Sequence, residues 1–178
     1  MLKLMMILTL GLTFSASLYS AQLESEFQVL GVTLGKSTLK EVKEKFKAQE
    51  IFHEGEAETS LSVLCFKSSS GATIAFESVG INGAEQVVNT IAINAPSAPY
   101  KLNQICEKTS LIKTKIIMNK LSLGMSPDLV KALKGSPAKQ ETNKMEYKYS
   151  SQDKTSALII EFKDSMSHKM IASQKGMN

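Results

Sequence analysis

The stretch that decides the fold occurs twice: residues 32–42 read VTLGKSTLKEV, and residues 121–130 read LSLGMSPDLV. Both copies have an apolar residue, any residue, Leu, Gly, any residue and Ser. A segment with the helical spacing of apolar side chains follows each motif. Recurrence of this kind is the sequence signature of a repeated structural unit. We therefore expect two related halves in this chain.

A helix is predicted to begin directly after each motif. In the first copy, Thr38 and Glu41 have the spacing of a capping box. In the second copy, Ser126 is a suitable N-cap, Pro127 fits the first helical position, and Gly135 ends the helix. The apolar positions expected to face the core are Leu39, Val42, Phe46, Val130 and Leu133.

Three segments of strand-like composition follow each helix, with turn residues between them. These segments are 59–67, 72–78 and 87–94 in the first half, and 145–149, 156–163 and 169–173 in the second. The prediction is an α+β fold in which two tandem helix–three-strand-meander repeats form an antiparallel sheet, with the helices packed on one face. The expected divisions are a first repeat at 22–95, a linker at 96–110 and a second repeat at 111–178.

Residues 1–21 have the pattern of a secretory signal peptide. One lysine precedes an uncharged apolar run at 4–16, and small residues then lead to a polar segment after Ala21. Cleavage is expected after Ala21, with Ser17 and Ser20 as alternatives. An uncleaved membrane anchor is the competing interpretation, but the apolar run is shorter than the roughly 20 residues that a spanning helix needs. We expect a periplasmic or secreted protein.

The two cysteines, Cys65 and Cys106, are expected to form one structural disulfide, because thiols in exported proteins are usually oxidised. Neither follows the predicted cleavage site, so lipid anchoring through a lipoprotein signal is not expected. Their spacing also lacks the Cys-x-x-Cys pattern of redox enzymes.

The composition is that of a globular protein, with 43% hydrophobic and 21% charged residues and a formal net charge of +4. Every basic residue is Lys, and many Lys alternate with Glu, as on a solvated helix face. Nucleic-acid binding is not expected, because basic stripes and arginines are absent from the sequence. After the signal, no second apolar run has the length of a membrane span.

The candidates for catalytic or metal chemistry are few. His53 lies beside Glu54, Glu56 and Glu58, a set that could bind a metal weakly, although a solvated loop is the favoured interpretation. His168 lies in a predicted polar turn. The sequence contains no Gly-x-Ser-x-Gly elbow and no glycine-rich phosphate loop. We therefore predict a protein that is not an enzyme and that holds no metal or other cofactor.

Three tyrosines are candidates for a binding surface, because Tyr is enriched in protein interfaces. Tyr147 and Tyr149 alternate with Lys148 and should share one face of a strand, where a role in the core is the competing interpretation. Tyr100 lies in the predicted linker.

The two motifs together resemble the tandem repeats of β-lactamase-inhibitor-protein-like domains and the related small lipoproteins of outer-membrane assembly (the SmpA/OmlA type). Besides the two Leu-Gly-x-Ser motifs, the resemblance rests on Gly-Ser-Pro at 135–137 and Tyr-Lys-Tyr at 147–149. The first copy lacks the Gly-x-Pro. The resemblance implies an α+β repeat fold and binding to other proteins in the periplasm or outside the cell.

The functional prediction is a soluble, non-enzymatic periplasmic protein-binding or envelope-assembly module, whose partner is another envelope or secreted protein. The first alternative is a secreted inhibitor of a hydrolase such as a β-lactamase. The second is an enzyme with an unrecognised site.

Overall fold

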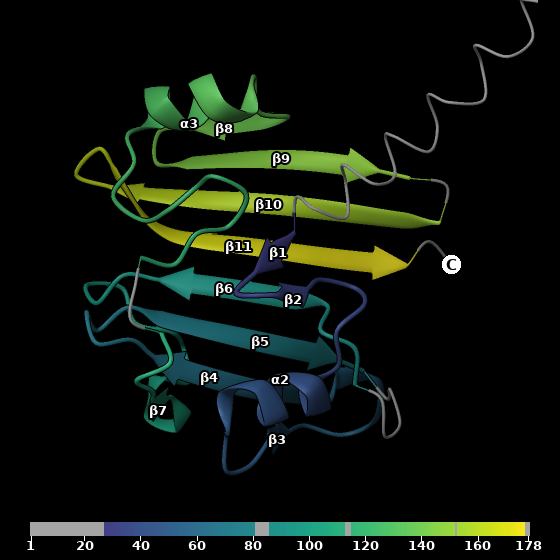
Figure 1. The fold of residues 1–178 in the computed structure, drawn as a ribbon. Coiled ribbons are helices and arrows are strands. Elements are labelled where there is room, and N and C mark those ends of the chain that lie inside the picture. The colour runs from purple at the N-terminus through teal and green to yellow at the C-terminus, as the bar shows by residue number, and fades with distance from the viewer. Residues whose placement is uncertain (1–26, 81–85, 113–114, 152, 177–178) are drawn as a thin grey trace, which may run out of the picture.

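The protein has an α+β fold, in which a broad sheet is flanked by short helices (Figure 1). The computed structural model describes residues 27–80, 86–112, 115–151 and 153–176. The predicted signal peptide at 1–21 lies outside these described residues. Within them, no helix combines the length and apolar character that crossing a membrane requires.

The two α-helices begin at the predicted residues. Helix α2 (Leu39–Phe46) has a complete capping box, because Thr38 and Glu41 each accept a hydrogen bond from the other's backbone N–H. Helix α3 (Pro127–Lys134) begins after Ser126, whose side chain accepts from the third helical N–H, and ends at Gly135. Local capping signals therefore determine where both helices start.

A nine-stranded sheet runs through the described chain in the order β3-β4-β5-β6-β11-β10-β9-β8. All pairings along this path are antiparallel, and β7 lies parallel to one end of β4. The strands are β3 (Phe52–Glu54), β4 (Leu61–Lys67), β5 (Thr73–Val79), β6 (Thr90–Asn94), β7 (Glu107–Lys108), β8 (Lys139–Glu141), β9 (Lys144–Ser150), β10 (Lys154–Lys163) and β11 (Met166–Gly176). A separate hairpin consists of β1 (Gln28–Val29) and β2 (Val32–Thr33).

The six predicted strands are confirmed as β4, β5, β6, β9, β10 and β11. The strands that the prediction missed have only two or three residues each, too few for an alternating pattern to show. The last strand of each half, β6 and β11, pair directly. One continuous sheet therefore joins the predicted halves (Figure 1).

The main core lies on one face of this sheet, here called the first face. Alternate residues of the long strands join one buried cluster with the apolar residues of α2 and with Val130 of α3. Phe46, Phe66 and Phe76 pack ring against ring within this cluster. Leu133, expected in the core, is 40% exposed. Helix α3 is only eight residues long and buries Val130 alone.

The opposite face, here called the second face, is covered over the first half of the sheet by residues 95–108, here called the strap. The strap contains the short 3-10 helix Asn103–Ile105 and β7. The predicted disulfide is confirmed: Cys106 of the strap is bonded to Cys65 of β4. Val63, Cys65, Ala75, Ala92 and Tyr100 form a second, smaller core beneath it. The predicted linker is thus a packed layer.

Candidate binding site on the second face of the sheet

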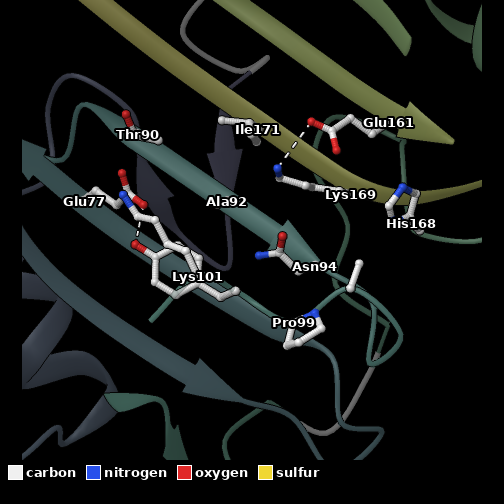
Figure 2. Close-up of a pocket in the computed structure, with 12 residues that line it drawn as sticks. Glu77, Thr90, Ala92, Asn94, Pro99, Lys101, Glu161, His168, Lys169 and Ile171 are labelled. Atoms are coloured by element: carbon white, nitrogen blue, oxygen red, sulfur yellow. Dashed lines mark hydrogen bonds and ion pairs between the residues drawn. The ribbon is translucent and has the colours of Figure 1, made fainter. Parts of the chain in front are cut away.

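A pocket of about 390 Å³ opens on the second face, between the strap and strands β6, β10 and β11 (Figure 2). Ala92 and Ile171, which pair across β6 and β11, belong to its lining. Pro99 and Tyr100 line it from the strap. The volume lies in the range of small-ligand sites, and the mixture of apolar surface with a few polar groups is typical of them.

Glu77 lies at one end of the pocket (Figure 2). This residue of β5 is 8% exposed, and its carboxylate accepts a hydrogen bond from the hydroxyl of Tyr100. Burial, and then the hydrogen bond to Glu77 and the charge of that carboxylate, raise the pKa of Tyr100 above its ordinary value. Tyr100 is therefore a phenol, and a donor to Glu77, across the physiological pH range.

Lys169 and Glu161 lie at the other end of the pocket, where they form an ion pair of 3.3 Å (Figure 2). Asn94 lies beside Lys169 in the register of β6 and β11 and is 1% exposed. The side-chain nitrogen of Asn94 has no hydrogen-bond partner among the described residues. Buried amide groups are nearly always paired, so this unpaired nitrogen is an exception at the edge of the pocket.

The second face over β9, β10 and the adjoining part of β11 has half-buried and exposed side chains, and we call this part the open face; Ile171 at its edge also packs against the core beneath the strap. Ala157 and Ile159 of β10 are half-buried at its centre, and Ile159 pairs with the half-buried Ile171 of β11. Around them lie charged side chains of both signs: Lys144, Glu146, Lys148, Glu161 and Lys169. A small apolar centre with a charged rim has the anatomy of a protein interface.

The three tyrosines predicted as an interface do not share one surface. Tyr147 is buried on the first face and donates a hydrogen bond of 3.2 Å to the carbonyl of Gly135. Tyr149 also lies on that side and packs edge-to-face against Phe27, with ring centroids 5.4 Å apart. Tyr100 alone lies on the second face, where it joins the pocket.

The two histidines lie far apart in the fold. Nδ1 of His53 is 2.8 Å from the hydroxyl of Ser62, a spacing that suits a nucleophile and its base. However, Ser62 is 4% exposed, and no described carboxylate holds the ring of His53. His168 lies at the bulge of β11 and lines the pocket. Within the described part of the chain, no three His, Cys, Asp or Glu side chains gather as metal ligands.

Sequence reasoning missed the pocket, because its residues come from five elements: β5, β6, the strap, β10 and β11. The polar residues Glu77, Asn94 and Lys169 lie on three different strands, β5, β6 and β11. Only the pairing of these strands brings them onto one face of the sheet. The alternation of polar and apolar residues in β6 was the one available signal, since Thr90 and Asn94 share a face with Ala92. Comparison with protein-family models, curated proteins and solved structures finds no match to this chain.

Proposed function

We propose that this chain is an exported, non-catalytic protein that binds another exported or envelope protein through the open face. The observation that supports this proposal best is the arrangement of Ala157, Ile159 and Ile171 inside a rim of alternating charge. The apolar centre supplies surface to desolvate, and the rim supplies complementary charges that select the partner.

Export is supported by the signal-like pattern at residues 1–21 and by the disulfide between Cys65 and Cys106. Structural disulfides persist in oxidising compartments and are rare in the cytosol. The disulfide holds the strap on the second face, beside the open face. A strap held by a disulfide suits a protein that works outside the reducing cytosol.

We also propose that the two halves are tandem repeats of one unit, in which a tight turn, the Leu-Gly-x-Ser motif, a helix and antiparallel strands follow one another. Each half begins with a two-residue turn whose residues both have positive φ, at 30–31 and at 119–120. Turns of this type match the twist of paired strands.

The two motif glycines support the same proposal. Gly35 and Gly124 have φ values of 73° and 83°. Each donates a backbone hydrogen bond of 2.8 Å toward the last strand of its own half, to the carbonyls of Val88 and Ser167. These similar contacts support the proposal of tandem repeats, which the resemblance to β-lactamase-inhibitor-protein-like domains implies.

Site-specific photo-cross-linking tests the proposed function. A photoreactive amino acid at position 159, on the open face, should give one discrete adduct with an exported protein, mapped by mass spectrometry to a single surface. The matched control is position 133 on α3, where Leu133 is exposed but lies on the other side of the sheet. Equal adducts at both positions, or none at 159, would contradict the proposal.

A further inference from the structure

We propose that the pocket between the strap and β11 binds the amino-terminal end of a peptide, with the terminal ammonium group paired to Glu77. This site shares Glu161, Lys169 and Ile171 with the edge of the open face, but its anchor Glu77 lies outside that face, so the inference does not depend on the protein-binding function proposed above. It would exist even if no protein docked on β9 and β10.

The carboxylate of Glu77 is the group that requires a cation. It is buried, it lines the pocket, and Tyr100 is the only described residue with which it forms a hydrogen bond or ion pair. A buried carboxylate whose single partner is a neutral hydroxyl remains poorly compensated. An ammonium group in the pocket would supply the missing charge and further hydrogen-bond donors.

The ring of Tyr100 also favours a cation at this end of the pocket. Aromatic faces attract ammonium groups, and the Nζ atom of Lys101 already lies 6.0 Å from the centroid of this ring. The acidic residue Glu54, on β3 beyond β4, adds a smaller negative potential at the hydroxyl of Tyr100. Lys101 also lines the pocket but forms no ion pair with Glu77 among the described residues, so the carboxylate can still pair with the ammonium group of a ligand.

The middle of the pocket suits the backbone of a short extended chain. Thr90, which pairs with Glu77, and Asn94 are four residues apart on β6, a span of about 13 Å. Three to four extended residues cover that distance. Between Thr90 and Asn94, the small Ala92 lines the pocket and leaves room for short side chains.

Binding of trialanine amide to the purified, disulfide-intact protein tests the inference, followed by NMR chemical shifts of the backbone amides. We expect saturable shifts centred on Thr90, Ala92 and Asn94. The same peptide with an acetylated amino terminus lacks only the ammonium group and should bind at least about tenfold more weakly. Equal binding of the two peptides, or no shifts with either, would overturn the inference.

The variant Glu77→Gln isolates the charge, because the new side-chain carbonyl still accepts the hydrogen bond from Tyr100. It should bind trialanine amide at least about tenfold more weakly, with an unfolding midpoint no lower than that of the parent, because a poorly compensated buried charge is removed. Glu146→Gln, on the open face outside the pocket, is the matched control and should bind normally. Retained affinity of Glu77→Gln for trialanine amide would overturn the inference. Saturable binding of a 12-residue peptide that starts with three alanines would show that the pocket accepts the amino terminus of a longer chain.

Discussion

At the scale of single residues, the two motif glycines differ in what surrounds them. A Cβ atom at Gly35 would lie 1.7 Å from Oε1 of Gln174, whereas one at Gly124 would meet nothing within 4 Å. Both positions have positive φ, which L-residues with a side chain adopt at a cost of roughly 1–2 kcal/mol.

We therefore expect Gly124→Ala to lower the free energy of unfolding by about 1 kcal/mol through backbone strain alone. Gly35→Ala should cost more, because Gln174 must also move and weaken its hydrogen bond to Ser156, now 3.1 Å long. Urea denaturation of the two variants checks this order. Equal losses would show that the contact with Gln174 is unimportant.

The contact between Tyr100 and Glu77 predicts a dependence of stability on alkaline pH. Folding raises the pKa of Tyr100 above its ordinary value of 10.0, so the folded state keeps a proton that the unfolded state releases above that pH. This contribution is complete below pH 10 and declines by up to about 1.4 kcal/mol per pH unit above it.

The variant Tyr100→Phe should lack that decline and should also be less stable at neutral pH by about 1–3 kcal/mol, because the carboxylate of Glu77 loses the only donor that the described residues give it. Tyr147, whose pKa burial also raises, is present in both proteins and cancels in the comparison. Urea denaturation at about pH 8 and pH 11 tests the difference. Parallel losses in the two proteins would contradict the assigned role of Tyr100.

At the scale of elements, the strap depends on its disulfide. The bond between Cys65 and Cys106 closes a loop with a sequence separation of 41 residues, which stabilises the folded state by about 4 kcal/mol on the chain-entropy model. The double variant Cys65→Ser/Cys106→Ser should lose about that much in urea denaturation. Alkylation of both cysteines in native, unreduced protein would show that the bond does not form.

Elements with strong local signals were predictable from the sequence, and elements fixed by distant contacts were not. The capping residues around Thr38 and Ser126 located both helices, and strand-like composition between turn residues located six strands. The strap was predicted as a linker, because nothing local shows that Tyr100 reaches Glu77 or that β7 pairs with β4. The pocket was missed for the same reason.

At the scale of the whole molecule, the protein must be exported before it can bind the proposed partner. The purified protein from the cell envelope or medium should begin at Gln22, which follows the expected cleavage site. Amino-terminal sequencing checks this directly, and a start after Ser17 or Ser20 would still indicate a cleaved signal. A chain that retains residues 1–21 and remains in the cytoplasm would contradict export.

The arrangement of the sheet gives the molecule two different sides for recognition. The first face is filled by the main core and the helices, whereas the second face combines the strap, the pocket and the open face. Protein binding on the open face and peptide binding in the pocket use different central residues, Ile159 and Glu77. Variants at these two positions therefore separate the two proposals.

If the open face binds a partner protein, the variant Ile159→Glu should lose affinity for the cross-linked partner. A charge placed at the half-buried centre should weaken binding at least about tenfold, while Leu133→Glu on α3 should bind as the unmodified protein does. Both variants should keep the unfolding midpoint of the parent. Unchanged affinity of Ile159→Glu, or an equal loss in Leu133→Glu, would contradict the account.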